Sequence, residues 1–341
     1  MRLLVCTSYH YYGSVRGIEP QFYYLYRVPE SLGHTVDFFD YLTATAIGPE
    51  QMRRAFVSTV RGGGYDAVFI ATHKDEFNRE TLAEAARHSP VIGWNSDDEW
   101  RWESYSQPRA AWYSYMVTNS PEVYERSRAA VPNLLHAQWA CTGFWDGRAT
   151  RKDIDFSFVG QVYGSRAPQI RWLARRADLR AFGKGTRNVA LPAAPAEDRV
   201  KRAQRALQRA ILKYALPGLA DELSVISFEQ VNALWNRSKI SFTPLDSSQD
   251  NVRQIKSRVF DMGLSGTLML AHRAPYLDSY YEPGKEYVPF ESLEECADQA
   301  RFYLENERAR AKIAAAYARR TAAEHLWKHR IERVLSAAGI T

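Results

Sequence analysis

The sequence has few cysteines and no long hydrophobic run, and both absences restrict the class of protein. Its 341 residues include three cysteines, and no two of them form a CxxC pair. This spacing fits neither a zinc site nor a disulfide framework, and it favours a reducing compartment such as the cytoplasm. No stretch approaches 18 uninterrupted apolar residues, so we expect no membrane-spanning helix. The apolar run at the N-terminus is too short for a secretion signal and is typical of a first strand.

Two binding signatures are also missing. The sequence contains no Walker A pattern and no visible metal-binding motif. Its 45 basic and 39 acidic residues give a net charge of +6, which suits an anionic ligand such as a nucleotide, or an anionic membrane surface. The cations are not concentrated in a recognised nucleic-acid module, so we expect no nucleic-acid partner.

The composition and the pattern of the first half indicate an α/β protein. With 45% hydrophobic and 25% charged residues, the chain is typical of globular proteins, and its length suggests two domains. Short apolar runs alternate with helical patterns, which predicts a parallel sheet with helices on both faces. The expected strands are 2–9, 34–41, 65–72, 90–96 and 113–120, and the expected helices are 19–32, 49–61, 79–88 and one starting at Pro121.

The second half repeats this pattern after a polar linker at 147–152. Ser227 with Gln230, and Ser292 with Glu295, have the spacing of helix capping boxes. From Ser292 to about residue 337 we expect helix throughout. The other expected strands are 153–160, 179–185, 239–244 and 267–271, and the other expected helices are 167–177, 199–214, 228–237 and 254–264.

Ligands of open parallel sheets bind at the carboxyl ends of the strands. In the first half this rule selects His10, Asp40, His73, Lys74, Asp97, Asp98 and Asn119. Adjacent carboxylates between tryptophans, as in Asp97 and Asp98, predict an acceptor-binding or general-base group. The alternative is a solvated loop in which one of them caps a helix. His10 could act as a base at neutral pH, or it could simply be hydrogen-bonded.

Two segments of the second half are candidates for binding phosphate. The Gly-bearing loop 160–166 leads into a helix, so its backbone amides and Arg166 could hold an anion. Lys256 and Arg258 lie just past a strand end, where cations suit a pyrophosphate. Asp261, one turn further on, could accept both hydroxyls of a ribose. The alternative is a helix with ordinary surface charges.

Residues 199–214 carry six cations and no acid, with apolar positions along one face of the expected helix. A basic amphipathic helix can lie on an anionic membrane. The alternative, which we favour, is a surface helix that packs through its apolar stripe.

The stretch from QIKSRVFDMGL to HRIERVL (254–335) resembles the C-terminal domain of CgeB-like glycosyltransferases. DIDFSFVGQVYGSR and SFEQVNALWNRSKISF are similar to the segments that precede it in that family, in the same order. The resemblance implies a GT-B fold, with two Rossmann-like domains facing a central cleft. It further implies an acceptor-binding domain at 1–148, a nucleotide-sugar-binding domain at 149–320, and a final helix within 321–341 that crosses back.

The same resemblance implies roles for single residues. Asp261 would bind the donor ribose, although the family usually has Glu there. Lys256 and Arg258 would face the diphosphate. Arg253 occupies a position that is acidic in many retaining relatives, so the resemblance does not imply a retaining mechanism. Further donor contacts would come from Gly160, Arg166, and the segment with His272, Pro275 and Tyr276. No cofactor or metal is expected, because cations and helix dipoles would stabilise the leaving diphosphate.

The leading hypothesis is a glycosyltransferase that moves a sugar from a nucleotide diphosphate donor to a hydroxyl acceptor. The acceptor would be a cell-surface glycan, a lipid-linked saccharide or a small molecule. If the reaction inverts, Asp97, Asp98 or His10 would take the proton. The alternatives are a nucleotide-sugar epimerase on the same fold and a non-catalytic sugar-binding or surface-assembly protein. We expect a cytoplasmic protein, with 199–214 as the candidate contact to the inner membrane face.

Overall fold

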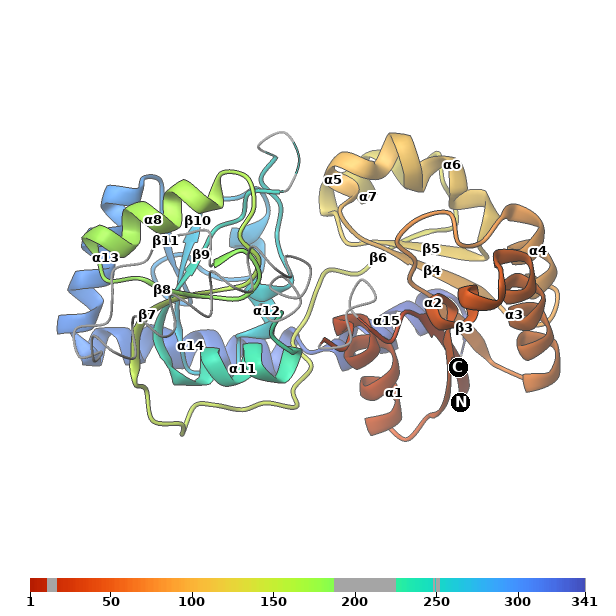
Figure 1. The fold of residues 1–341 in the computed structure, drawn as a ribbon, viewed down its shortest axis with the longest axis horizontal. Coiled ribbons are helices and arrows are strands. Elements are labelled where there is room, and N and C mark those ends of the chain that lie inside the picture. Colours follow the sequence, from red (N-terminus) through yellow and green to blue (C-terminus); the bar gives the residue numbers. More distant parts are fainter. Residues whose placement is uncertain (11–16, 187–224, 248, 250–251, 341) are drawn as a thin grey trace, which may run out of the picture. The chain divides into compact units, whose positions relative to one another are not determined.

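The chain forms two compact units, each built around its own sheet (Figure 1). The computed structural model describes residues 1–10, 17–186, 225–247, 249 and 252–340. Within these ranges, unit 1 comprises residues 1–10, 18–143 and 323–340. Unit 2 comprises residue 17, residues 144–186 and the described residues from 225 to 322.

Unit 1 contains a six-stranded parallel sheet in the order β2-β1-β3-β4-β5-β6. The second strand lies on one side of the first and the third strand lies on the other, so the strand order reverses between β1 and β3. All residues of β3 and β4 are buried, as expected for strands covered on both faces. The strands are β1 (Arg2–Thr7), β2 (Thr35–Asp40), β3 (Ala67–Ile70), β4 (Val91–Asn95), β5 (Tyr115–Thr118) and β6 (Leu134–His136).

The longer helices of unit 1 bury apolar residues along one face. In α3, Met52, Phe56 and Val60 recur every fourth residue and are all buried. Asn78 and Ser120 cap the starts of α4 and α7 with their side chains. The helical segments are η2 (Phe22–Arg27), α1 (Val28–Ser31), α2 (Tyr41–Ala44), η3 (Thr45–Ile47), α3 (Pro49–Gly63), α4 (Arg79–Ala86), α5 (Asp98–Arg101), η4 (Trp102–Ser106), α6 (Gln107–Arg109), η5 (Ala110–Trp112), α7 (Pro121–Ser127) and α15 (Trp327–Ala337).

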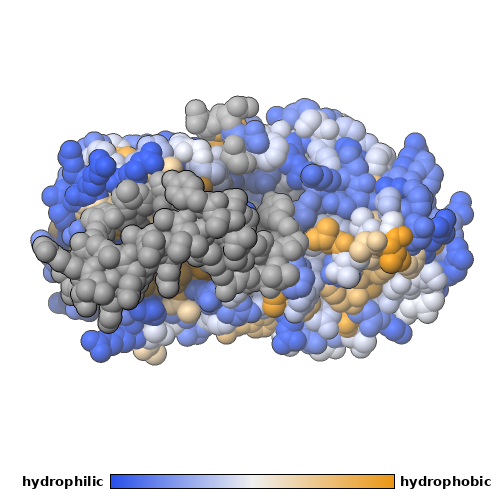
Figure 2. Space-filling view, viewed as in Figure 1, coloured by the Kyte–Doolittle hydropathy of each residue, from blue (hydrophilic) through white to orange (hydrophobic). Residues whose placement is uncertain are grey.

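The segment after β2 leaves apolar side chains in contact with solvent. Leu42 in α2 is 38% exposed and Ile47 in η3 is 64% exposed. Figure 2 shows hydrophobic residues at the surface in this part of unit 1. Because α2 begins where β2 ends, this surface adjoins the carboxyl edge of the sheet.

Helix α15, the last in the chain, packs within unit 1. Trp327 is buried and stacks on Tyr24, with ring centroids 4.6 Å apart. The backbone of Cys141 donates to His325 O and accepts from Trp327 N, at 2.9 and 2.8 Å. Arg330 Nε donates to a backbone carbonyl of the segment that follows β6, at 3.0 Å. These contacts attach residues distant in sequence to the core of unit 1.

Unit 2 contains a five-stranded parallel sheet in the order β11-β10-β9-β7-β8, which reverses between β7 and β9. Its core joins buried aromatic residues of β7 and β9 to apolar faces of α8 and α13. The strands are β7 (Ile154–Val159), β8 (Arg180–Phe182), β9 (Ser238–Thr243), β10 (Leu268–His272) and β11 (Val288–Phe290). The helical segments are α8 (Arg166–Arg176), α11 (Phe228–Arg237), α12 (Arg258–Asp261), η7 (Leu277–Ser279), α13 (Leu293–Glu305) and α14 (Glu307–Glu324).

The structure confirms the α/β class and the parallel sheets, and it corrects two of the expected helices. The helix expected at 254–264 contains only α12, because the backbone from Gln254 to Lys256 is not helical. The continuous helix expected up to residue 337 is three helices, with a non-helical Asn306 after α13 and an extended Leu326 before α15. The expected helix 199–214 lies outside the described residues. None of the helices that the structure describes is long and apolar enough to cross a bilayer.

Candidate functional site

Each sheet has one position where its strand order reverses, and such positions place a crevice at the carboxyl ends of the strands. In unit 2 this position lies between β7 and β9, and in unit 1 it lies between β1 and β3. The residues that follow these four strands are therefore the first candidates for a site.

Arg258 and Gly160 meet at the carboxyl end of β7. A Cβ atom added to Gly160 would lie 3.1 to 3.3 Å from the guanidinium of Arg258. The φ of Gly160 is +147°, and Gly183 at the end of β8 approaches its carbonyl so closely that an added Cβ would lie 2.5 Å from the oxygen. A cation next to a glycine loop at the switch point of a parallel sheet is a suitable place for a phosphate.

Arg166 is buried, with 1% of its surface exposed. Its Nη1 donates to Gln161 O at 3.2 Å and its Nη2 donates to Asp246 O at 2.8 Å. Its guanidinium also lies 3.9 Å from the centre of the Tyr163 ring. The side chain thus joins the loop after β7 to the loop after β9. The sequence analysis expected Arg166 to contact a phosphate, which requires an exposed side chain. The buried position of Arg166 differs from that expectation.

Asp246, which the sequence analysis did not select, follows β9 and is largely buried. One carboxylate oxygen accepts from Gln169 Nε2 at 3.0 Å and from Ser165 Oγ at 3.3 Å, and it lies 4.0 Å from His272 Nδ1. The other oxygen lies 3.9 Å from Arg253 Nε. Asp246 follows the carboxyl end of a strand, so the same rule that selected residues in the first half also selects it in the second half.

The remaining donor residues expected from the sequence lie on the same edge of unit 2 or on the loops that follow it. Asp261, at the end of α12, is 5% exposed, and Lys256 is half-buried two residues before that helix. His272 ends β10, and burial lowers the pKa of its imidazole below the usual range. Pro275 and Tyr276 are exposed, and the φ of Tyr276 is +64°.

The three residues expected to act as a base lie in unit 1, in different environments. Asp98 is fully buried, and Ser106 Oγ donates to its Oδ1 at 2.5 Å. This buried placement differs from the accessible position that a base acting on an acceptor hydroxyl requires. Asp97 is half-buried with φ +63°, and its side chain makes no cap on α5. His10 pairs with Ile18 in an isolated antiparallel bridge, and its ring lies against that of Tyr9.

A second group in unit 1 lies at the reversal between β1 and β3. Ser8 follows β1 and His73 follows β3, and Ser8 Oγ lies 3.5 Å from His73 Nε2. Glu19 Oε2 lies 3.8 Å from the same nitrogen. Glu19 is 2% exposed, whereas the His73 side chain is 26% exposed.

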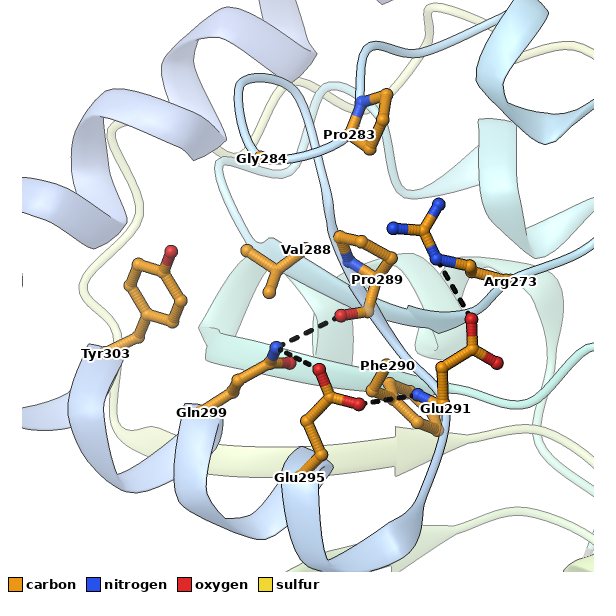
Figure 3. A pocket seen from close by; sticks show the side chains of 10 residues that line it. All are labelled: Arg273, Pro283, Gly284, Val288, Pro289, Phe290, Glu291, Glu295, Gln299 and Tyr303. Carbon is orange, nitrogen blue, oxygen red and sulfur yellow. Dashed lines mark hydrogen bonds and ion pairs between the residues drawn. The ribbon is translucent and has the colours of Figure 1, made fainter.

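A separate cavity of about 450 Å³ lies beside the edge strand β11 and the helix α13 (Figure 3). Its polar groups largely bond one another: Arg273 Nε lies 3.0 Å from Glu291 Oε1, and Gln299 Nε2 donates to Pro289 O and to Glu295 Oε1. Of the segment 272–276 expected to contact the donor, Arg273 lines it, but the individually expected donor residues do not. Within the described part of the chain, no group of three or more His, Cys, Asp or Glu residues is arranged to hold a metal ion.

Residues 199–336 match a family model described as glycosyl transferase-like, which covers less than half of the chain. No curated protein sequence matches. Among solved structures, Anabaena Alr3699/HepE in complex with UDP aligns with a TM-score of 0.55 at 12% identity, over 99% of this chain and 100% of that one. The fold is GT-B. The CgeB-like subfamily is not resolved by these matches.

Two further structures support the assignment of this GT-B fold. Sucrose-phosphate synthase from Thermosynechococcus elongatus aligns with a TM-score of 0.58 at 13% identity, over 99% of both chains. An alpha-glucosyltransferase solved with UDP-glucose and DNA aligns with a TM-score of 0.63 at 9% identity, also over 99% of both chains. At these identities the likeness establishes the fold. Together with the family match, it agrees with the glycosyltransferase class expected from the sequence.

Proposed function

We propose that the protein is a nucleotide-sugar-dependent glycosyltransferase, in which unit 2 binds the donor and unit 1 binds a hydroxyl acceptor. The observation that carries the proposal is the guanidinium of Arg258 beside Gly160, at the switch point of the unit 2 sheet. The glycosyl transferase-like match covers this part of unit 2 from residue 199 onward.

Each donor contact has a proposed role. When the acceptor oxygen attacks the anomeric carbon, the bond from that carbon to the diphosphate breaks and its electron pair stays on the diphosphate. Lys256 and Arg258 stabilise the negative charge that develops there. Asp261 accepts the ribose hydroxyls. Arg166 and Asp246 hold the surrounding loops in place through the bonds described above.

The proposed nucleotide is a uridine diphosphate. HepE was solved with UDP and with UDP-glucose, and the alpha-glucosyltransferase with UDP-glucose. The CgeB-like subfamily, a cytoplasmic location and contact of 199–214 with an anionic membrane stay predictions from the sequence. The acceptor is a glycan, a lipid-linked saccharide or a small molecule.

A panel of nucleotides tests the donor site directly. UDP, GDP, dTDP, ADP and CMP are each added with and without Mg²⁺, and the melting temperature is measured. At a hundredfold excess over its Kd, a bound nucleotide stabilises the native state by about 2.7 kcal/mol. We expect UDP to raise the melting temperature, and Arg258→Ala and Asp261→Ala to remove most of that rise.

Arg237→Ala is the matched control, because Arg237 lies at the opposite end of β9 and pairs on the surface with Asp153. It should leave the UDP shift unchanged. A protein that no nucleotide stabilises would contradict the proposal and favour a non-catalytic role. A sugar nucleotide that is converted without any acceptor would indicate an epimerase instead.

A further inference from the structure

The cavity beside β11 lies apart from the residues that the proposed function uses. Its volume of about 450 Å³ falls within the range of ~300–1,000 Å³ that is typical of small-molecule sites. β11 is the last strand in the order of its sheet, two strands from β9, where the order reverses. The edge strand and the helix α13 beside it form the walls of the cavity (Figure 3). No residue with a proposed donor role lines it.

One face of α13 supplies most of the polar groups. Glu295, Gln299 and Tyr303 recur every fourth residue, so they form a row along the helix, and all three line the cavity. Val288 and Pro289 of β11 lie opposite this row (Figure 3). The cavity therefore combines hydrogen-bonding groups, an aromatic ring and an apolar wall.

The amide of Gln299 has an acceptor that the protein leaves unused. Its Nε2 donates to Pro289 O at 3.1 Å and to Glu295 Oε1 at 3.2 Å. Both partners are acceptors, so the amide cannot turn over without placing oxygen against oxygen. Its Oε1 is buried and receives no hydrogen bond from any residue that the structure describes. Because such an acceptor is costly, the cavity favours a ligand that donates hydrogen bonds.

The sequence of the edge strand argues against another β-strand as the occupant. Pro289, the middle residue of β11, has no N–H group to donate. Its carbonyl oxygen already accepts a hydrogen bond from Gln299. The outer edge of β11 is thus a poor template for pairing with another backbone.

The charges that line the cavity are balanced against one another. Arg273 Nε lies 3.0 Å from Glu291 Oε1, and Glu295 Oε2 accepts from Glu291 N at 2.7 Å. An anionic ligand would find the guanidinium already paired and two carboxylates beside it. A cationic ligand would meet the positive charge of Arg273. The lining therefore fits a neutral ligand better than a charged one.

We propose that the cavity between β11 and α13 binds a neutral saccharide. The hydroxyls of a sugar donate hydrogen bonds, for which the carboxylates of Glu291 and Glu295 and the oxygen of Gln299 are acceptors. The C–H faces of the sugar ring pack on the ring of Tyr303 and on Pro289. Saccharide binding at this site is separate from the sugar transfer proposed above and does not depend on it.

Hydrogen exchange with and without added sugar locates the site. Maltose, cellobiose and N-acetylglucosamine are the probes, and UDP is present in excess so that the proposed donor site is occupied. At ten times its Kd, a bound sugar should slow exchange by up to about tenfold where opening of the backbone releases it. We expect at least one probe to slow exchange in peptides from 284–303 and to leave α11 unchanged.

Two variants test the lining residues. Tyr303→Ala removes the aromatic face and Gln299→Leu removes the amide, and each should weaken sugar binding, measured by saturation-transfer NMR, by about tenfold. Phe302→Ala is the matched control, because Phe302 is the neighbouring aromatic residue of α13, is 53% exposed and does not line the cavity. Tyr303 is only half-buried, so its variant keeps the test available where Gln299→Leu does not fold.

Three results would overturn the inference. These are no protection of 284–303 by any of the three sugars, unchanged sugar affinity in the folded variants, or protection by the polycation spermidine in place of a sugar. The thermal shift with UDP should be the same in both variants, in the control and in the parent protein. A parent protein that binds a sugar here but shows no UDP shift would contradict only the proposed function, so the two failures differ.

Discussion

Asp98 carries a carboxyl group into the interior of unit 1. Burial raises its pKa to about 6, and hydrogen bonds from Ser106 and Thr118 act in the opposite direction without cancelling that effect. The group therefore contributes to the pH dependence of stability.

The raised pKa of Asp98 gives a pH-dependent prediction with a definite sign. In the unfolded chain an aspartate titrates near 3.9, so between about pH 6 and pH 4 the native state holds a proton that the unfolded state lacks. The native state is then stabilised as the pH falls through 6, by at most about 3 kcal/mol. Asp98→Asn should remove this contribution, which denaturant unfolding at pH 7 and pH 4.5 would measure.

Asp97→Asn is the control for that prediction, because Asp97 is adjacent and only half-buried. Its variant should keep the wild-type difference in unfolding free energy between the two pH values. Other buried groups, such as His136 with its pKa lowered to about 4 by burial, change stability with pH in the opposite direction. The contributions of these other groups to the pH dependence cancel when the variant is compared with the parent protein. Equal pH dependence in Asp98→Asn and the parent would refute the assignment.

Two arginines of unit 2 show what the sequence could not distinguish. Arg166 and Arg258 both lie near the loops at the carboxyl edge, and both were expected to contact phosphate. The structure uses Arg166 to bond two backbone carbonyls, whereas the Arg258 guanidinium lies against Gly160. A cation that supports the backbone and a cation that faces a ligand have the same sequence signature. The two kinds of arginine can be told apart only by whether folding brings backbone carbonyls within reach of the guanidinium.

At the scale of the elements, the turn after β8 holds the described glycine of unit 2 at which an added Cβ would come closest to a backbone atom. Gly183 has a φ of +116°, and an added Cβ would lie 2.5 Å from the carbonyl oxygen of Gly160. This carbonyl belongs to the loop beside Arg258, so distortion of one loop displaces the other. A backbone atom cannot move aside as the end of a flexible side chain can.

We therefore expect Gly183→Ala to destabilise the protein and weaken UDP binding together. Gly284→Ala is the matched control, because Gly284 also has a positive φ, +77°, but an added Cβ would meet nothing within 4 Å. The control should cost about 1 kcal/mol from backbone conformation alone. Urea unfolding and the UDP thermal shift measure both effects. If the two variants behave alike, the close approach to Gly160 has no energetic consequence.

The pattern of elements was more predictable than their ends. Strands buried on both faces appear as short apolar runs between turn residues, and β1, β3, β4 and β7 lie within the expected ranges. Of the three described strands with three residues, β8 was expected but β6 and β11 were not, because a strand of that length carries little periodicity of its own. The capping box at Ser227 is present, since it depends only on neighbouring residues.

The approach of Glu19 to His73 in unit 1 could be predicted only in part. His73 was selected from the sequence because it follows an expected strand. Glu19 lies 54 positions earlier and becomes its neighbour only through the packing of unit 1. Asp246 contacts Gln169 and His272 through the same kind of long-range approach. Sequence patterns predict which residues lie at the edge of a sheet. Which of their side chains come into contact there depends on the order and register of the strands, and these are known only from the structure.

At the scale of the whole molecule, unit 1 is assembled from separate parts of the chain. Residues 323–340 complete it, and Trp327 is buried against Tyr24 and Trp94. Loss of a buried tryptophan typically costs about 3–5 kcal/mol. The stability of unit 1 therefore depends on residues that the chain adds only after unit 2.

Trp327→Ala should lower the stability of unit 1 and leave unit 2 protected. Hydrogen exchange would then rise in β1 to β6 while the amides of α8 and α13 stay slow. Lys328→Ala, at an exposed neighbouring position of α15, is the control and should change neither unit. Equal loss of protection in both units would indicate that they unfold as one cooperative structure. No change in either would contradict the role given to Trp327.

The return of α15 to unit 1 also sets an order for biosynthesis. A ribosome releases the chain from the N-terminus onward, so every strand of unit 1 emerges before unit 2, but the helix that packs on Tyr24 emerges after it. All of unit 2 leaves the exit tunnel in between. During translation, the synthesis of unit 1 therefore begins before that of unit 2 and is completed after it. The apolar surface around Tyr24 and Trp94 therefore stays uncovered until α15 has been synthesised.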